Sequence, residues 1–403
     1  MKRQNVKIGL FGYGVVGQGL HDVLNESKGF HADIKRICVK HRNKKRRLPM
    51  HYFTWDKQDI LDDPEINLVV ELIDDAEEAF DIVSTALSQE KNVVTANKKM
   101  VAEHLDELIR IQEKNNVSLL YEGAVCGAIP IIRNLEEYYD NELLYSLRGI
   151  FNGSTNYILS KMFNENRDYE EALHEAQKLG FAESDPWLDV SGTDANYKLS
   201  IIMEHAYGLY IRPENIFHLG ITNINSQDMQ FAREKGYRIK LVPYAGRVGK
   251  NELTGFVLPR FLTADKKLFT VENEYNGVVV EAAFAEKQFF YGKGAGGHPT
   301  GSAVLSDISA NSFFYAYEYK KRKQNLGLSF TTDVTLEVYF RYQDKKDMDL
   351  LDFENITESY TGPEYSYRIG KISLQELFEK KEEILNKDVS VINTGFKPEK
   401  KDR

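Results

Sequence analysis

Residues 6–17 read VKIGLFGYGVVG, and this stretch decides the fold of the first part of the chain. The apolar run predicts a buried strand, and the residues after it predict a helix over 15–26. In such a strand–turn–helix the first glycine permits a tight turn, the second lets the backbone approach a pyrophosphate, and the third lets strand and helix pack closely. The predicted dinucleotide contacts are Gly12, Gly14, Val15, Val16 and Gly17. The alternative is a glycine-rich turn that binds no ligand.

The segments that follow alternate between strand and helix up to about residue 130. Strands are predicted over residues 34–39, 67–73, 92–95 and 117–121, and helices over residues 80–89 and 101–114. Alternation at this spacing is typical of a parallel sheet with helices on both faces. We therefore predict an α/β, doubly wound sheet of the Rossmann type for residues 1–130, with NAD(P) as its ligand.

Residues 131–320 show a different pattern. A helix is predicted to begin at the N-cap Asp168, with Glu171 three residues later, and to stop at Gly180. Further elements are expected as a helix over residues 193–207, strands over 239–248, 278–284 and 288–291, and a closing helix over 301–317. Helices combined with one mainly antiparallel sheet predict an α+β domain.

Residues 321–403 form a third predicted segment. Apolar and polar residues alternate from Val334 to Arg341, which predicts a half-buried strand. Ser373 and Glu376 form a capping box for a helix over residues 374–385. Further strands are expected over residues 365–372 and 389–392. This order predicts a small β-α-β-β-α-β module.

Composition excludes several classes of protein. The 403 residues hold 52 Lys and Arg against 61 Asp and Glu, a net charge of −9. A mildly acidic chain argues against binding to nucleic acid or to a membrane surface. No segment approaches the roughly 18 apolar residues of a membrane span. The two cysteines, Cys38 and Cys126, exclude a disulfide scaffold and a four-cysteine zinc site, and they fit a reduced cytoplasmic compartment.

The end of the second predicted strand bears on the choice of cofactor. An NAD enzyme usually carries Asp or Glu there for the ribose 2′-hydroxyl. Residues 38–46 read CVKHRNKKR, with no carboxylate and several cations. A 2′-phosphate favours such cations. We predict NADP as the preferred cofactor, with Lys40 and Arg42 nearest to the phosphate. NAD remains possible, and the alternative is a solvated basic loop.

Three further segments carry a resemblance. They are VTANKK at residues 94–99, the acidic stretch from Glu183 through Asp185, Asp189 and Asp194 to Lys198, and GKGAGGHPTGSAV at residues 292–304. With the glycine loop, over residues 6–317, they resemble the homoserine dehydrogenase family. That family reduces L-aspartate 4-semialdehyde to L-homoserine with NAD(P)H, on the route to threonine, methionine and isoleucine. No aspartate kinase segment precedes the glycine loop, so the monofunctional form is expected.

The resemblance implies roles for particular residues. Lys98, rather than Lys99, matches the lysine between cofactor and substrate, and Lys198 matches the acid/base. The implied substrate-binding residues are Gly180, Glu183 and Asp194. The implied cofactor contacts, besides the glycine loop, are Thr95, Lys98, Gly294 and Gly296. A sodium ion is implied at the carbonyls of Glu122, Val125, Gly127 and Ile129, with a plain strand-to-helix connection as the alternative. Residues 151–157, FNGSTNY, resemble the Asn-Gly-Thr-x-Asn segment at the head of a helix.

The chemistry of the reaction fits these residue types. Hydride addition to an aldehyde creates an alkoxide, which needs a proton donor or a cation beside it. A lysine supplies both. Asp194 and Lys198 are four residues apart on one predicted helix and so share a face. Either Glu183 or Asp194 would hold the substrate ammonium group. The alternative for Asp194 and Lys198 is a surface ion pair.

The chain departs from the family at two places. Asp74 and Asp75 stand where the family usually has a glycine pair, and they either alter cofactor contacts or face solvent. The C-terminal module resembles an ACT domain but lacks the usual Pro-Gly turn after its first strand. Dimer contacts and feedback by threonine are both open for this module.

Two other functions compete with the dehydrogenase. One is a cysteine-dependent semialdehyde dehydrogenase, for which Cys126 is the candidate nucleophile, with no histidine nearby in sequence. The other is a non-catalytic NADP-binding sensor, which would not need the two lysines and two carboxylates. The resemblance implies a small-molecule substrate and a homodimer, or a dimer of dimers, formed by residues 131–320.

Overall fold

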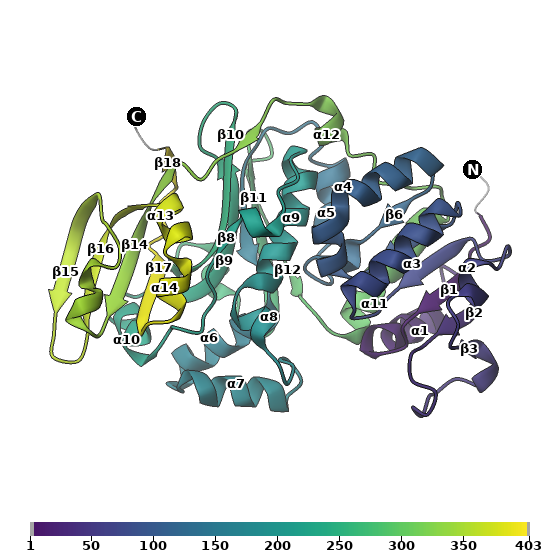
Figure 1. Cartoon of the computed structure of the whole chain (residues 1–403), viewed down its shortest axis with the longest axis horizontal. Helices are drawn as coiled ribbons and strands as arrows, with labels where there is room; N and C mark the ends of the chain where they lie inside the picture. Colours follow the sequence, from purple (N-terminus) through teal and green to yellow (C-terminus); the bar gives the residue numbers. More distant parts are fainter. Residues whose placement is uncertain (1–3, 401–403) are drawn as a thin grey trace. The chain divides into compact units, whose positions relative to one another are not determined.

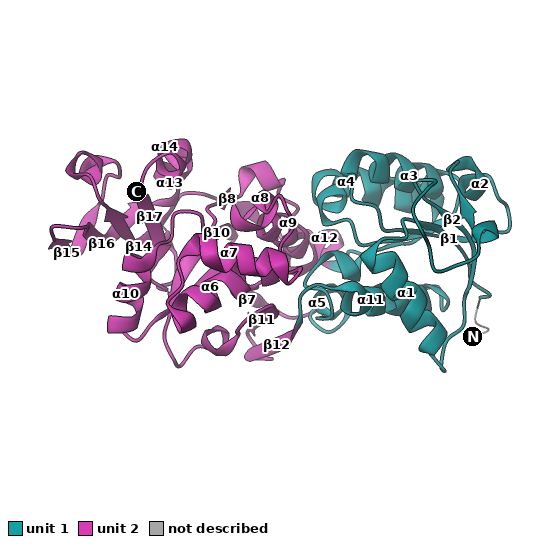
Figure 2. Ribbon diagram, turned by 90° about the horizontal axis from the view of Figure 1, so that it is seen from below, with its two compact units in different colours: residues 1–140, 293–320 teal, residues 141–292, 321–403 magenta. Residues whose placement is uncertain are grey.

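The computed structural model describes residues 4–400 (Figure 1). They divide into two compact units, shown in different colours in Figure 2. Unit 1 comprises the described residues up to Asp140 together with Lys293–Lys320, and unit 2 comprises Asn141–Gly292 and the described residues from Lys321 onward. The division into three consecutive functional segments, 1–130, 131–320 and 321–403, stays a prediction.

Unit 1 is built on a six-stranded sheet in the order β3-β2-β1-β4-β5-β6, in which every neighbouring pair is parallel. Its strands are β1 Lys7–Phe11, β2 Asp33–Cys38, β3 Phe53–Thr54, β4 Leu68–Glu71, β5 Asn92–Thr95 and β6 Leu119–Leu120. Their apolar side chains are almost all buried, which explains the apolar runs in the sequence. The predicted doubly wound α/β fold is confirmed.

Helices cover both faces of this sheet. They are α1 Val15–Glu26, α2 Gln58–Leu61, α3 Ala76–Ser88, α4 Lys98–Asn115, α5 Ile131–Glu137 and α11 Gly297–Asn311. In Figure 2, α3 and α4 lie on one face, and α1 and α11 lie on the other. Helices α1 and α11 touch backbone to backbone, because a Cβ atom at Gly19 would lie 2.1 Å from the Gly297 carbonyl oxygen. The helix predicted over 301–317 therefore belongs to unit 1, and it starts four residues earlier than expected.

Two helices of unit 1 also begin before their predicted starts. The side chain of Asp75 accepts the Glu78 N–H at 2.9 Å, so α3 starts at Ala76. The side chain of Asn97 accepts the Met100 N–H at 3.0 Å, so α4 starts at Lys98. These N-caps extend each helix beyond its apolar repeat.

Unit 2 contains a twelve-stranded mixed sheet. Nine strands form its main path in the order β12-β11-β7-β9-β10-β17-β14-β16-β15. The first group of strands is β7 Leu144–Ile150, β8 Phe217–His218, β9 Arg238–Arg247, β10 Glu252–Leu262, β11 Tyr275–Ala282 and β12 Lys287–Lys293. The second group is β13 Ser329–Phe330, β14 Val334–Tyr342, β15 Asn355–Thr361, β16 Ser366–Ser373, β17 Val389–Asn393 and β18 Glu399–Lys400.

The helices of unit 2 include the one predicted to begin at the N-cap Asp168 and the one predicted over residues 193–207. They are α6 Gly153–Glu165, α7 Tyr169–Lys178, α8 Trp187–Val190, α9 Thr193–Tyr207, α10 Ser226–Glu234, α12 Lys320–Gln324 (across the unit boundary), α13 Leu374–Glu379 and α14 Lys381–Leu385. Asp168 caps α7 by accepting the Glu171 N–H at 2.8 Å, and α9 spans the predicted residues. The single helix predicted over 374–385 is wrong in detail, since it is broken at Lys380.

The C-terminal strands share a core with the earlier part of unit 2. Phe340 of β14 belongs to the same apolar cluster as Phe217, Tyr244 and Phe256. The fully buried Arg341 pairs with Asp228 of α10 at 3.0 Å. The element order agrees with the predicted β-α-β-β-α-β pattern, with a short 3-10 turn as its first helical element. The ACT-like identity of this segment stays a prediction.

No helix within residues 4–400 is both long enough and apolar enough to cross a membrane.

Candidate functional site

The glycine loop between β1 and α1 has the shape that a dinucleotide needs. Gly12 has φ +91°, and a Cβ atom there would lie 2.4 Å from the Leu72 carbonyl oxygen. A Cβ atom at Gly17 would lie 2.5 Å from the Gly12 carbonyl oxygen. At Gly14, the N-cap of α1, nothing lies within 4 Å of the Cβ position. The first and third glycines are thus required by packing, and the second leaves open space at a helix N-terminus, as a phosphate requires.

The exposure of the two valines after Gly14 also fits a bound dinucleotide. The side chain of Val15 is 74% exposed beside the open position, and Val16 is partly buried. The residues present therefore fit a nicotinamide dinucleotide at this end of the sheet.

Several basic side chains in the stretch after β2 already contact other residues of unit 1. Arg42 stacks over the ring of Trp55 at 5.1 Å, and Arg46 donates to the Lys44 carbonyl oxygen at 3.0 Å. Arg47 pairs with Asp22 at 3.3 Å. Lys40 is exposed and makes no ion pair with the part of the chain that the structure describes.

The carboxyl ends of β4 and β5 carry a ring of hydrogen bonds. Glu71 is fully buried, and its Oε1 accepts the Ile73 N–H at 2.6 Å while its Oε2 accepts the Thr95 hydroxyl at 2.6 Å. The Thr95 oxygen accepts the Asn97 N–H at 3.0 Å, and Asn97 Nδ2 donates to the Ile73 carbonyl oxygen at 3.1 Å. Sequence reasoning missed Glu71, although a lone carboxylate in the apolar run VVELI was a signal.

Burial governs the ionisation of this carboxyl. Desolvation raises the pKa of Glu71 to about 7, against the opposing effects of the bonds from Thr95 and Ile73, while Asp74 adds to the rise. In the unfolded chain its ordinary value is 4.5.

We expect Glu71 to make stability depend on pH. Between pH 4.5 and about 7 the unfolded chain loses a proton that the folded chain keeps, so stability falls as pH rises. The fall attributable to Glu71 should be about 3 kcal/mol. Urea unfolding of wild type and Glu71→Gln across this range measures it as a difference between the two proteins. Parallel pH profiles would contradict the expectation.

The lysine predicted between cofactor and substrate starts α4. Lys98 is half-buried and Lys99 is exposed, directly after the capping residue Asn97. The preference for Lys98 over Lys99 stays a prediction. Of the two unexpected carboxylates, Asp75 caps α3 and Asp74 is exposed.

The segment predicted to hold sodium turns sharply beside the one predicted at the nicotinamide. Cys126 and Gly127 have φ values of +56° and +54°, and a Cβ atom at Gly127 would lie 2.5 Å from the Gly294 carbonyl oxygen. The carbonyl of Glu122 accepts the Val125 N–H at 3.2 Å, and that of Ile129 accepts the Ile131 N–H at 2.8 Å. Each of these carbonyls keeps a second lone pair. Gly296 has φ +118° and is the N-cap of α11.

A buried acidic cluster anchors this segment. The carboxylate of Glu122 accepts the N–H groups of Ile132 and Arg133 at 2.9 and 2.8 Å, and so it caps α5. The Glu122 N–H donates to Asp307 Oδ2 at 2.8 Å, and Arg133 pairs with Asp307 Oδ1 at 2.7 Å. Burial raises the pKa of both carboxyls, and Arg133 opposes this rise at Asp307. The role predicted for Glu122 concerns its carbonyl, whereas its side chain has this structural role.

Unit 2 holds the second lysine in a buried polar network. Lys198 lies one turn after Asp194 on α9, and its Nζ donates to Asp194 Oδ2 at 2.7 Å and to the Phe151 carbonyl oxygen at 2.7 Å. Their side chains are 9% and 1% exposed. The alternative of a surface ion pair is therefore wrong.

Three more residues complete this network, and sequence reasoning did not select them. Asn152 Nδ2 donates to Asp194 Oδ2 at 2.8 Å and to Asp189 Oδ1 at 2.7 Å. Ser154 Oγ donates to Asp189 Oδ2 at 2.8 Å. The signals were present, because Asn152 and Ser154 stand at the head of α6 and Asp189 lies in the acidic stretch before α9.

Two predicted substrate residues lie outside the hydrogen bonds of that network. Gly180 ends α7 with φ +77° and is exposed. Glu183 is exposed in the following turn, where its carbonyl oxygen accepts Gln177 Nε2 at 3.0 Å, and its carboxylate bonds to no residue within 4–400. An exposed carboxylate can reach a substrate ammonium group, so the role of Glu183 stays a prediction.

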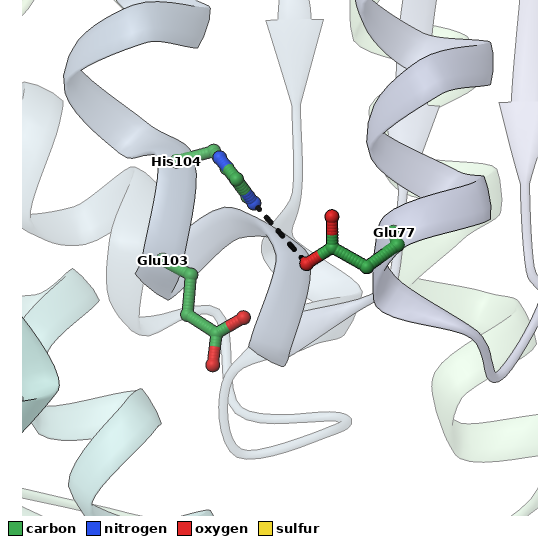
Figure 3. Close-up of side chains that lie close together, drawn as sticks. All are labelled: Glu77, Glu103 and His104. Carbon is green, nitrogen blue, oxygen red and sulfur yellow. Dashed lines mark ion pairs between the residues drawn. The ribbon is translucent and has the colours of Figure 1, made fainter.

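One other group of described side chains offers ligand atoms for a metal ion. It consists of Glu77, Glu103 and His104 on α3 and α4 (Figure 3). His104 Nε2 lies 3.9 Å from Glu77 Oε1, and the side chain of Glu77 is 80% exposed. His104 also stacks on Phe80 with ring centroids 3.9 Å apart. These residues differ from those of the predicted sodium segment.

Comparisons with known proteins agree on one family. The family model described as "Homoserine dehydrogenase, NAD binding domain" matches residues 12–122, and the one described as "Homoserine dehydrogenase" matches residues 130–309. A homoserine dehydrogenase of Bacillus subtilis (strain 168) is 38% identical over 314 residues, covering 76% of this chain and 72% of its own. Both parts of the predicted resemblance are thus matched.

Solved structures give the same result. A homoserine dehydrogenase from Thiobacillus denitrificans has a TM-score of 0.85 at 28% identity, covering 97% of this chain and 98% of its own. A hyperthermophilic archaeal homoserine dehydrogenase mutant, solved in complex with NADPH, has a TM-score of 0.67 at 26% identity and covers 78% of this chain and 100% of its own.

Proposed function

The chain belongs to the homoserine dehydrogenase family, and from this we propose that it interconverts L-aspartate 4-semialdehyde and L-homoserine with a nicotinamide cofactor. The observation that carries the proposal is the buried Lys198, held by Asp194 and the Phe151 carbonyl in unit 2. NAD(P)-dependent oxidation of homoserine by the purified chain tests it. A chain that binds NADPH without turnover would instead support the sensor.

The cofactor, when bound, supplies or accepts the hydride. We propose that Gly12, Gly14, Val15, Val16 and Gly17 hold its pyrophosphate. The other proposed cofactor contacts in unit 1 are Lys40, Arg42, Thr95, Lys98, Gly294 and Gly296. The open space at Gly14 supports this assignment.

In the reduction, the aldehyde oxygen becomes an alkoxide and needs a proton. We propose that Lys198 donates that proton, because an ammonium group held by Asp194 is fixed in direction and keeps protons to give. For Lys98, we propose a role between cofactor and substrate, as the family resemblance implies. Glu183 or Asp194 holds the substrate ammonium group, and both residues and Gly180 line the substrate site.

A mechanism based on a cysteine thioester has no support. Cys126 is fully buried within the turn before α5, whereas a nucleophile must reach its substrate. The family assignment also argues against this alternative.

We propose NADP as the preferred cofactor. The double variant Lys40→Ala with Arg42→Ala should lower kcat/KM for NADP by about tenfold or more, because it removes both cations nearest to the 2′-phosphate. The value for NAD should change little. Arg47→Ala is the matched control, since Arg47 belongs to the same basic stretch but pairs with Asp22. A wild type that prefers NAD would overturn the proposal.

We also propose that the carbonyls of Glu122, Val125, Gly127 and Ile129 hold a sodium ion. The paired left-handed residues Cys126 and Gly127 support it, because such irregular backbone suits a carbonyl ring for a hard cation. Rates in sodium chloride and potassium chloride at equal ionic strength test this proposal, and equal rates count against it.

Two further proposals concern assembly and location. We propose that the protein works in the cytoplasm as a homodimer, or as a dimer of dimers. The family assignment supports the dimer. Size-exclusion chromatography with light scattering measures the molar mass of the protein in solution. A monomer at working concentration would overturn it.

For the C-terminal strands, threonine feedback and dimer contacts predict different outcomes. If the segment binds threonine, millimolar threonine should inhibit homoserine oxidation. If it only supports assembly, threonine should leave the rate unchanged. A threonine titration of the purified enzyme, with equimolar serine as the control, separates the two.

A further inference from the structure

The hydrogen-bond ring at the ends of β4 and β5 is a closed circuit. It runs from Glu71 to Thr95, from Thr95 to Asn97, from Asn97 to Ile73, and from Ile73 back to Glu71. Two of its bonds are made by the two oxygens of one carboxyl group. Removing that group would therefore open the circuit at two points at once.

The ring fixes where two helices begin. Asn97 also caps α4, whose first residue is Lys98. Ile73 lies two residues before Asp75, the cap of α3. Both loops lie at the carboxyl ends of neighbouring parallel strands, which is where doubly wound sheets bind their ligands.

The carboxyl of Glu71 joins two loops at a cost in desolvation. Glu71 is fully buried among apolar strand residues, and desolvation opposes its charge. An apolar residue in its place would remove that cost but would leave the Ile73 N–H and the Thr95 hydroxyl without their acceptor. The two hydrogen bonds of Glu71 therefore connect the loop after β4 to the loop after β5.

We propose that Glu71 is a positioning residue for the nicotinamide half of the cofactor site, acting through Thr95 and Asn97 on Lys98. The inference rests on the proposed function, which assigns Thr95 and Lys98 to that half. Glu71 itself touches neither cofactor nor substrate in this proposal.

The test compares two substitutions of Glu71, one that removes its hydrogen bonds and one that can preserve them. Glu71→Leu fills the space but removes both bonds. In Glu71→Gln the amide oxygen can still accept the Ile73 N–H, and the amide NH2 group can donate to the Thr95 oxygen, so both contacts can be kept with one of them reversed. Fluorescence titration with NADPH should give a dissociation constant about tenfold higher for Glu71→Leu and close to wild type for Glu71→Gln. The kcat for homoserine oxidation should fall about ten- to a hundredfold for Glu71→Leu, since small displacements of a reacting group have effects of this size. The KM for homoserine should stay within about threefold.

Two further variants test whether the effect of Glu71→Leu arises from the ring. Thr95→Val breaks the ring at its second member, so it should reproduce Glu71→Leu, and the double variant should be no worse than either single one. Glu136→Leu is the matched control, because Glu136 is a buried carboxylate of unit 1 that accepts the Tyr319 N–H at 3.1 Å away from this ring. It should leave NADPH affinity and kcat unchanged.

The outcomes are distinct. The proposal is overturned if Glu71→Leu and Thr95→Val bind NADPH and turn over like wild type, or if Glu71→Gln is as impaired as Glu71→Leu. If wild type binds NADPH but does not oxidise homoserine, the proposed function fails, and the NADPH titrations still decide the role of the ring. The melting temperature of Glu71→Leu should fall, because two buried donors lose their acceptor. NADPH affinity and kcat are therefore measured well below that temperature, where a purely structural role predicts no change in either.

Discussion

Replacing Lys198 by methionine is expected to lower kcat for homoserine oxidation by about a thousandfold. The side chain is buried on α9, and its ammonium group is held by Asp194 and by the Phe151 carbonyl oxygen. Methionine has a similar length and no charge, so the helix should still pack. What is lost is the group that we propose exchanges a proton with the substrate oxygen.

The measurement is steady-state oxidation of homoserine, with NADPH binding as a check that the cofactor site is intact. Lys161→Met is the matched control, because Lys161 also forms an ion pair with a residue four positions away, Glu165, at 2.5 Å. That pair is more exposed, and Lys161 has no proposed role in the reaction. Comparable rates for Lys198→Met and wild type would refute the assignment of the acid/base.

The second large effect is expected on stability. Asp307→Ala should reduce the free energy of unfolding of unit 1 by about 3–5 kcal/mol, the usual result of breaking a buried ion pair. It leaves the guanidinium of Arg133 without its carboxylate and the Glu122 N–H without its acceptor. Both groups would then remain desolvated and unpaired.

The two tryptophans make this measurable in one unit at a time. Trp55 lies in unit 1 and Trp187 in unit 2. In a Trp187→Phe background, urea unfolding followed by fluorescence reports on unit 1 alone. Asp81→Ala is the control, since Asp81 forms an exposed pair with Lys57 within the same unit, and such pairs contribute about 1 kcal/mol or less. Equal effects of the two substitutions would contradict the expectation.

Local chemistry made much of this fold predictable. The glycines at positions 12, 14 and 17 predict the first strand, turn and helix, because each of these positions in such a motif requires a residue without a side chain. The capping residue Asp168 and the glycine stop Gly180 located α7. Apolar runs located the strands of the parallel sheet, since those strands are buried on both faces.

The sequence did not predict elements that contain residues unfavourable for them. Strand β10 contains Gly255 and Pro259, which weaken any strand pattern, yet it pairs with β9 along its whole length. The membership of α11 in unit 1 could not be predicted, because an apolar face does not say which sheet it covers. The ring around Glu71 depends on two loops that meet only in three dimensions.

The same limit applies to the candidate site. The pairing of Asp194 with Lys198 follows from their spacing on one helix. Its burial, and the contributions of Asn152 and Asp189, depend on how α6 and α8 pack against α9. Spacing along one helix contains no information about that packing.

Unit 1 is discontinuous, and this has a consequence for how the protein is made. The strands of its sheet are translated before unit 2, but α11, which packs on α1 at Gly19, is translated only after the whole first segment of unit 2, Asn141–Gly292. While this segment of unit 2 is synthesised, the face of α1 that α11 later covers stays exposed on the nascent chain. Unit 1 can therefore be completed only after Lys320, its last residue, has been translated.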